Sequence, residues 1–246
     1  MFMRNLLLTI SFDGSAYHGW QVQENAVTVQ QTLQDAWEKV CRSRDNVIGC
    51  SRTDAGVHAN MYCCNFRTEN EISCDKLIQA LNANLPDDIA VSDCREVPYE
   101  FHARYDCKSK EYIYKIWNKP EKNPFLYKYS LHYKYPLDEK FLDSQAKQFI
   151  GKYDYSAFCA AGSSVEDMVR NVTDAEVTRD GDIVIFRVRA DGFLYNMVRI
   201  MTGTLIEISA GKIMPDTIKE IIVSEDRSRA GATARPEGLF LNKIFY

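Results

Sequence analysis

The sequence predicts an α+β protein made of two halves around mostly antiparallel strands, and two observations favour this class. Up to residue 97 the patterns follow the order strand–helix–strand–strand–helix–strand, which is typical of a ferredoxin-like unit. After residue 106, strand patterns, a hairpin and amphipathic helices follow without a low-complexity linker. The 246 residues also suit one large or two modest domains, at about 150 residues per domain. We therefore expect one half over residues 1–106 and another over residues 107–246.

The elements of the first half follow from apolar periodicity and from helix boundary signals. Thr28 is expected to be a helix N-cap, with Gln31 at the capping-box position, and apolar residues at helical spacing continue to residue 41. A second amphipathic helix begins after Ser73 and ends before Pro86. Strands are predicted over residues 6–12, 47–48, 61–66 and 89–97.

The second half is assigned from the same signals. A turn at residues 179–182, Arg-Asp-Gly-Asp, joins two apolar strand patterns into a hairpin. Loops are expected at residues 120–124, which are rich in turn formers, and at residues 153–162. The predicted strands cover residues 110–118, 172–178, 183–190 and 239–246, and the predicted helices cover residues 138–150, 195–209 and 215–224.

The candidate functional stretch is the polar segment at residues 50–59, Cys-Ser-Arg-Thr-Asp-Ala-Gly-Val-His-Ala. It connects two strand patterns, and loops held by strands often carry binding and catalytic side chains. Gly56 allows a sharp turn close behind Asp54, and Arg52 is near enough in sequence to pair with that carboxylate and keep it ionised. On local chemistry alone, an ordinary Asx-turn beside a surface ion pair is the favoured explanation of these residues, because such short loops are common.

The full string at residues 52–59 resembles the catalytic loop of the tRNA pseudouridine synthase A (TruA) family, in which the Asp is the essential carboxylate. Further stretches resemble motifs of that family and occur in the family's order, from near one end of the chain to the other. They are residues 12–21, 101–104 with 110–114, 192–199 and 234–239. The resemblance implies the pseudouridine synthase fold, with two ferredoxin-like halves around a mostly antiparallel sheet and a central cleft.

The resemblance also implies an activity, the isomerisation of uridine to pseudouridine at positions 38–40 of the tRNA anticodon stem-loop. The uridine has to be flipped out of stacked RNA, and a carboxylate then acts on the sugar while the glycosidic bond breaks. Asp54 fits either as the nucleophile at C1′ or as the base that removes the C2′ proton. By the same resemblance Arg199 orients Asp54, Arg52 binds RNA and Tyr112 stacks on the flipped uracil. The reaction requires no metal and no cofactor.

Four further residues are weaker candidates for substrate contacts. Phe101, His102 and Arg104 could touch RNA, although a core aromatic residue beside a hydrogen-bonded histidine explains them as well. Leu239 could form part of the pocket wall, although it directly follows a Pro-Glu-Gly turn that accounts for its position.

The charge distribution bears on the nucleic-acid partner. The net charge of −4 argues against an RNA ligand when the chain is taken as a whole. Residues 1–106 carry 9 Lys+Arg and 15 Asp+Glu, however, and residues 107–246 carry 21 and 19. Within residues 104–134 eight basic and eight aromatic side chains interleave, and such side chains neutralise phosphates and stack on bases. A strand pair with lysines on its solvent face explains this segment about equally well.

Compartment and assembly are predicted from indirect signals. The eight cysteines lack the spacing of a zinc site and are expected to be free thiols in a reducing compartment. The chain has no membrane-spanning apolar run and no secretory cleavage site near its start, so we expect a cytoplasmic protein. The family implies a homodimer whose subunits share each tRNA, and Tyr127, Tyr129 and Tyr133 could serve its interface.

Two other classes of function are kept as alternatives. A non-catalytic RNA-binding or RNA-folding module could share the fold, but it would be expected to have lost Asp54, Arg199 or Tyr112, and all three are present. A lyase or hydrolase of nucleosides is the second alternative, and it would act on free nucleosides without tRNA.

Overall fold

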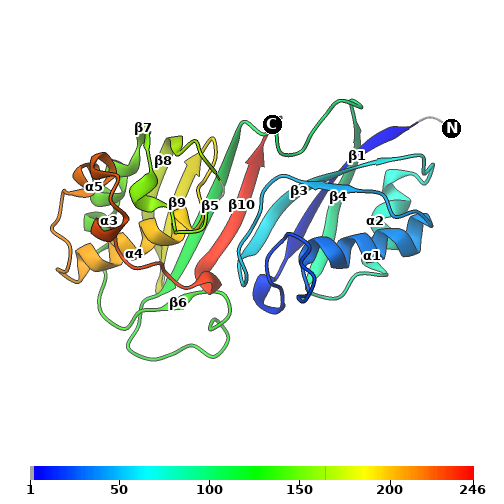
Figure 1. Cartoon of the computed structure of the whole chain (residues 1–246). Coiled ribbons are helices and arrows are strands. Elements are labelled where there is room, and N and C mark those ends of the chain that lie inside the picture. Colours follow the sequence, from blue (N-terminus) through cyan, green and yellow to red (C-terminus); the bar gives the residue numbers. More distant parts are fainter. Residues whose placement is uncertain (1–2, 164) are drawn as a thin grey trace. The chain divides into compact units, whose positions relative to one another are not determined.

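The structure is a computed structural model that describes residues 3–163 and 165–246. The chain forms two compact units, Met1–Lys108 with Leu241–Tyr246, and Ser109–Phe240. Each unit contains mostly antiparallel strands and helices, so the predicted α+β class is confirmed (Figure 1). Among the described residues, no helix has both the length and the apolar character needed to cross a membrane.

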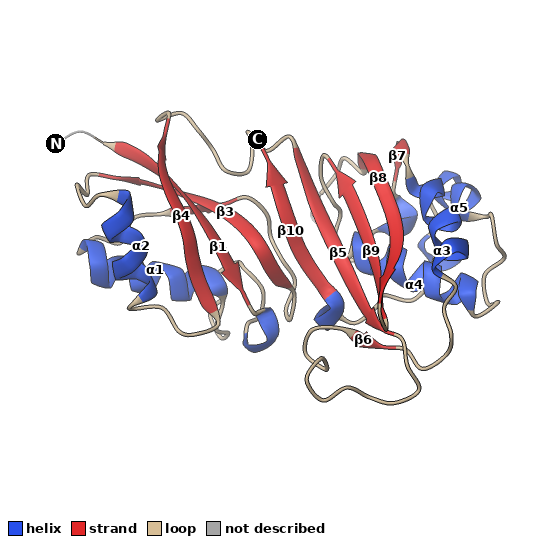
Figure 2. Ribbon diagram, turned by 180° about the vertical axis from the view of Figure 1, so that it is seen from behind, coloured by secondary structure: helices blue, strands red, loops and turns tan. Residues whose placement is uncertain are grey.

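The first unit has the β-α-β-β-α-β order that the sequence predicts. Its elements are β1 (Arg4–Phe12), α1 (Val29–Cys41), β2 (Val47–Gly49), β3 (His58–Thr68), α2 (Cys74–Asn82) and β4 (Ile89–Val97). Strand β1 pairs antiparallel with both β4 and β3, and β2 pairs antiparallel with β3. Both helices lie on one face of this sheet (Figures 1 and 2).

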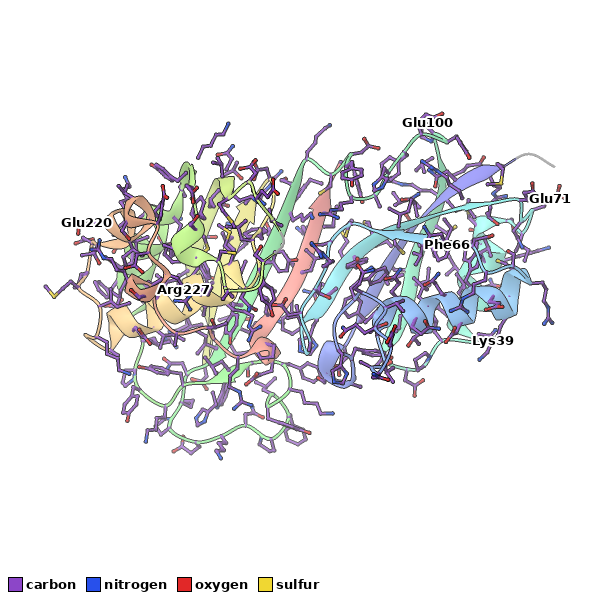
Figure 3. The ribbon with its side chains drawn as sticks, viewed as in Figure 1. Lys39, Phe66, Glu71, Glu100, Glu220 and Arg227 are labelled. Atoms are coloured by element: carbon purple, nitrogen blue, oxygen red, sulfur yellow. The ribbon has the colours of Figure 1, made fainter. Side chains whose placement is uncertain are left out.

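Helix α1 covers the sheet through the apolar stripe that its sequence predicts. Val29, Leu33 and Trp37 are fully buried, as the helical spacing requires. The ring of Trp37 stacks on Phe66 of β3, with centroids 3.9 Å apart and planes 7° apart, and Figure 3 labels Phe66. This stacked pair forms the centre of the core between α1 and the sheet.

The second unit contains the remaining helices and most of the remaining strands. They are β5 (Ser109–Trp117), β6 (Leu131–His132), α3 (Glu139–Ala146), β7 (Gly151–Asp154), β8 (Val169–Asp180), β9 (Ile183–Ala190), α4 (Met197–Ser209) and α5 (Ile218–Ser224). The strands run in the antiparallel order β5-β9-β8-β7, and β6 pairs parallel with β5. Every second residue of β9 is buried, which fits helices packed on one face of this sheet (Figure 2).

The last strand, β10 (Leu239–Phe245), begins in the second unit and continues into the first. Its first two residues belong to the unit of β5, and its residues from Leu241 onward belong to the unit of β1. The side-chain amide of Asn60 in β3 donates to Oδ1 of Asn242, at 2.9 Å. The C-terminal residues therefore complete the first unit, although they are far from it in sequence.

Two predicted elements need correction. The loop expected over residues 153–162 contains the end of β7 and a short 3-10 helix at Ser156–Phe158. A four-residue strand reading Gly-Lys-Tyr-Asp is too short to show an alternating pattern. The helix expected from residue 215 begins only at Ile218, because Asp216 has a φ of +60°, which a right-handed helix does not allow.

Candidate active site

Asp54 lies in a tight turn within the connection between β2 and β3. Its backbone carbonyl accepts a hydrogen bond from the backbone N–H of Val57, at 3.2 Å. Gly56 takes a φ of +78° at the third position of this turn, where a residue with a side chain would be strained. The Asp54 side chain is half-buried and that of Arg52 is exposed. The turn is therefore closed by the backbone of Asp54.

The backbone of this loop is held by the segment that follows β1. The backbone N–H of Gly56 donates to the carbonyl of Tyr17, and that of Trp20 donates to the carbonyl of Thr53, each at 3.2 Å. Gly19 has a φ of +84°, and a Cβ there would overlap the carbonyl oxygen of Thr53. The motif at residues 12–21 therefore acts as the support of the Asp54 loop.

The aromatic side chains of this motif are packed in the core. Tyr17 and Trp20 are both buried, so these two rings serve core packing and are not surface groups. Trp20 stacks on Tyr62 of β3 with centroids 4.1 Å apart, and the Tyr62 hydroxyl donates to the backbone carbonyl of Ser51. The start of the loop is thus fixed from the sheet.

His58 holds the end of the same loop. It is fully buried, and its Nδ1 accepts a hydrogen bond from the backbone N–H of Gly14, at 3.0 Å. This contact gives His58 a structural role in joining β3 to the supporting motif. Residues on both sides of Asp54 are therefore tied to neighbouring backbone before any substrate binds.

Tyr112 is a buried residue of β5 in the second unit. The ring of Phe193 meets it edge-on, with centroids 5.1 Å apart and planes 82° apart. Such edge-to-face packing restricts the orientation of the Tyr112 ring. Phe193 belongs to the motif at residues 192–199 but had no individual role assigned from sequence. The contact of Phe193 with Tyr112 is apparent only in the three-dimensional structure.

Arg199 of α4 has its guanidinium oriented by its own unit. Nε donates to the backbone carbonyl of Ala234 at 2.7 Å, and Nη1 donates to Oδ1 of Asn196 at 2.6 Å. Asn196 precedes the helix with a left-handed backbone, at φ +60°, a conformation that asparagine tolerates better than most residues. The Arg199 guanidinium is therefore held within its unit by two hydrogen bonds.

The motif at residues 234–239 is seated against both α4 and β5. Ala234 contacts Arg199 in both directions, since its N–H also donates to the Arg199 carbonyl at 3.1 Å. The Tyr114 hydroxyl of β5 donates to the Arg235 carbonyl at 2.6 Å, and burial raises the pKa of Tyr114 above its usual value, so this donor stays protonated. Leu239, the last residue of this motif, is buried.

The segment that precedes this motif is also folded on itself. The Arg227 guanidinium donates to the carbonyl of Ala230 and to the hydroxyl of Thr233, each at 3.3 Å, and Figure 3 labels Arg227 on this segment. The backbone N–H of Gly231 donates to the Thr204 hydroxyl of α4, at 2.9 Å. The acceptor at Ala234 is consequently fixed relative to the helix that carries Arg199.

The motif at residues 101–104 is anchored to the first unit by two buried asparagines. The Asn5 amide donates to the backbone carbonyl of Phe101 at 2.8 Å. Asn65 accepts from the backbone N–H of Ala103 at 2.9 Å, and its amide donates to Asn5 at 2.8 Å. The Phe101 ring meets Tyr246 edge-on, with centroids 4.9 Å apart. The packing of Phe101 is therefore accounted for within the unit.

His102 organises the turn that follows. Its Nδ1 accepts from the backbone N–H groups of Arg104 at 3.2 Å and Tyr105 at 3.3 Å, and its own backbone N–H donates to the Asp106 carboxylate at 2.8 Å. Arg104 is exposed, with its guanidinium carbon 5.8 Å from the centroid of the exposed Tyr105 ring. Contacts of Phe101, His102 and Arg104 with RNA remain predictions.

The candidate residues are thus distributed over both units. Asp54, Arg52 and the motif at 101–104 belong to the first unit, and the second holds Tyr112 and Leu239 together with Arg199. Within residues 3–163 and 165–246, no group of three or more His, Cys, Asp or Glu side chains is arranged to hold a metal ion. The eight cysteines are thiols, and each is buried or half-buried.

Comparison with known proteins places this architecture in one family. A family model described as "tRNA pseudouridine synthase" matches residues 8–106 and 145–246. The chain is 46% identical to the "tRNA pseudouridine synthase A" of Thermoanaerobacter sp. (strain X514) and to that of Acetivibrio thermocellus. It is 43% identical to the "tRNA pseudouridine synthase A 2" of Clostridium perfringens. Each alignment spans 244 residues, which is 99% of this chain and 100% of the relative. The chain therefore belongs to the tRNA pseudouridine synthase family, whose members are isomerases that convert uridine to pseudouridine.

Proposed function

We propose that this chain isomerises uridine to pseudouridine at positions 38–40 of the tRNA anticodon stem-loop and that Asp54 is its catalytic carboxylate. The observation that carries the proposal is the support of the Asp54 loop. Its backbone is tied to Tyr17 and Trp20, and its flanks are tied to Tyr62 and His58. A side chain on a loop that is already ordered acts on the substrate without a further entropic cost.

The proposed chemistry rearranges the substrate without adding or removing atoms. The bond between N1 of uracil and C1′ of ribose breaks, the base turns, and C5 forms the new bond to C1′. The proton on C5 is lost, and N1 ends with a proton. Asp54 either attacks C1′ or removes the C2′ proton to give a glycal, and both routes require an ionised carboxylate. Since nothing is oxidised, reduced or hydrolysed, the chemistry requires no cofactor.

The other candidate residues support this chemistry in proposed roles. Arg199, with its guanidinium already oriented, aligns the Asp54 carboxylate, and Tyr112 stacks on the flipped uracil while Phe193 restrains its ring. Arg52, which is exposed, binds an RNA phosphate. Leu239 forms part of the pocket wall, and the motif at 101–104 contacts RNA. The halves 1–106 and 107–246 would then supply their residues to one cleft.

The proposal includes a cytoplasmic homodimer. Eight thiols fit a reducing compartment, where disulfides are rare. A symmetric dimer is the common form of soluble assembly, and it would allow one tRNA to contact two subunits. Sedimentation of the purified chain with and without tRNA measures the assembly directly.

Tritium release from an unmodified tRNA labelled at uridine C5 tests the proposed function. We compare a transcript with uridines at positions 38–40 with a matched transcript that carries cytidines there. The proposal predicts release from the first transcript only. Release from both would place the target elsewhere in tRNA. Release from neither would support a non-catalytic RNA-binding module, and cleavage of free uridine would indicate a nucleoside lyase or hydrolase.

A further inference from the structure

The long connection between β5 and α3 has no role in the site described above. We refer to its residues 119–135 as the basic aromatic loop. It extends past the end of β5 and includes the short strand β6 (Figure 1). The family model matches the chain on both sides of it, at residues 8–106 and 145–246, and does not include it.

The loop has a defined backbone although it contains little regular structure. The Asn118 amide donates to the carbonyls of Tyr133 at 2.9 Å and Tyr135 at 2.7 Å. The Trp117 indole donates to the carbonyl of Glu121 at 2.8 Å, which fixes the start of the loop. Both ends of the loop are therefore held by side chains of β5 and of the residue that follows it.

The loop exposes aromatic rings that a folded protein usually buries. Phe125 is 85% exposed, Tyr127 is 67% exposed and Tyr135 is 59% exposed. Single exposed apolar residues are ordinary, but several large rings on one ordered loop indicate an interaction site. Their flat faces suit stacking, and stacking on a base does not depend on the base's identity.

The charge of the loop favours RNA over a second copy of the chain. Four lysines occur in it against one acidic residue, Glu121, whereas the whole chain has a net charge of −4. Two of these lysines accompany exposed rings, since Nζ of Lys128 lies 5.9 Å from the Tyr127 centroid and Nζ of Lys134 lies 5.1 Å from that of Tyr135. In a two-fold interface where this patch meets itself, the like charges would repel. A polyanion with exposed bases complements both the lysines and the rings.

We propose that the basic aromatic loop is a second RNA-contact surface, which binds tRNA away from the uridine that reacts. Phe125 and Tyr127 stack on unpaired bases, and the adjacent lysines neutralise neighbouring phosphates. The inference rests on the proposed function in that it takes tRNA as the ligand. It assigns the loop to binding and not to the chemical step.

Binding of a fluorescent, unmodified tRNA transcript tests this surface. The variant Phe125→Ala with Tyr127→Ala is compared with Met214→Ala, which removes a side chain that is 73% exposed elsewhere in the second unit. We expect the Kd of the loop variant to rise about tenfold or more, because removing each base stack weakens binding several-fold. Its single-turnover rate at saturating tRNA and its Tm should match those of the natural chain.

Salt dependence tests the lysines separately. In Lys122→Ala with Lys134→Ala, the slope of log Kd against log salt should fall by about 0.7 to 0.9 for each phosphate that is no longer neutralised. Lys219→Ala, an exposed lysine of α5, should leave the slope unchanged. The inference is overturned if the Kd of the aromatic loop variant and the salt slope of the lysine loop variant equal those of their control variants. It is also overturned by a loop variant that converts a dimer to a monomer, because the surface would then join two copies.

The two proposals fail in different ways. If the natural chain forms pseudouridine and the loop variants bind tRNA normally, only the second RNA-contact surface is refuted. If the natural chain forms none but the loop variants still lose tRNA affinity, the proposed function is refuted and the surface is supported.

Discussion

Arg199 shows how single contacts can prepare a charged side chain for use. Its guanidinium is fixed by the carbonyl of Ala234 and by Oδ1 of Asn196, at 2.7 and 2.6 Å. Arginine presents several donors in a rigid plane, whereas lysine offers one flexible ammonium group. The orientation of the group, and not only its charge, is therefore the property that the fold provides.

For Arg199→Lys we predict a loss of rate with the fold intact. Losing hydrogen bonds of a charged group costs about 1.5 to 3 kcal/mol, which lowers kcat/KM roughly 10- to 100-fold. Single-turnover pseudouridine formation on tRNA measures the effect. Arg229→Lys, at a surface ion pair with Glu220, should retain the natural rate. Equal rates in the two variants would show that charge alone is sufficient at Arg199.

Gly19 is a second residue whose backbone determines the site. Gly19→Ala has to tolerate a φ of +84° and an overlap with the Thr53 carbonyl, whereas Gly211→Ala meets a φ of +70° in open space. We predict that Gly211→Ala costs about 1 kcal/mol and that Gly19→Ala costs several-fold more. At roughly 2–4 °C of Tm per kcal/mol, thermal unfolding resolves the two. Similar Tm values would mean that the Asp54 loop moves away easily.

At the scale of elements, the two helices of the first unit start differently. Oγ1 of Thr28 accepts from the backbone N–H of Gln31 at 3.3 Å, while Ser73 occupies the same position before α2 without a side-chain capping bond. Thr28→Ala should therefore lower the free energy of unfolding by about 1 kcal/mol, and Ser73→Ala by much less. Denaturant titration of both variants checks this. Equal losses would contradict the assignment of the cap.

Strong periodic signals explain which elements could be predicted from sequence. The stripe of α1 through Leu33 and Trp37 predicts both the helix and its buried face. The Gln31 side chain, however, turns along the helix, where its amide donates to Asp35 one turn away at 2.7 Å. Strand β7 has only four residues, which is too short for an alternating apolar pattern. The late start of α5 follows from the backbone conformation of Asp216, which residue types alone do not reveal.

The site could be predicted only in part for a related reason. Asp54 and Arg199 are proposed from local strings, whereas the support of the loop consists of backbone hydrogen bonds such as those of Tyr17 and Thr53. Nearly every residue carries the same backbone N–H and carbonyl groups, so these hydrogen bonds cannot be predicted from residue types or their spacing. The edge contact of Phe193 with Tyr112 is likewise set by the fold, since 81 positions separate them in the sequence.

At the scale of the whole molecule, the last residues close the first unit. The Tyr246 hydroxyl donates to the Ala103 carbonyl at 2.9 Å, and Asn242 accepts from Asn60. Contacts over so many residues arise from the path of β10, which no local pattern predicts. The contacts assign Leu241–Tyr246 to the first unit, and the placement of the half boundary near residue 106 remains a prediction.

Three thiols report on the integrity of the first unit. Burial raises the pKa of Cys41 to about 12 and raises that of Cys63 and Cys64 above the usual value. Because the thiolate is the reactive form, these three should resist iodoacetamide at pH 8 in the folded chain. Mass spectrometry should find them alkylated only after denaturation in guanidinium. Rapid alkylation under native conditions would contradict their burial.

The measurement that tests the central claim most directly is tritium release by Asp54→Asn and Asp54→Ala on a 5-tritiated tRNA. The turn at Asp54 uses its backbone carbonyl, so both variants should fold and bind tRNA with a Kd near that of the natural chain. We predict that release falls by roughly 10⁴-fold or more in both, as expected when a catalytic group is removed. Release within about tenfold of the natural rate in either variant, with tRNA binding retained, would show that another group performs the chemistry.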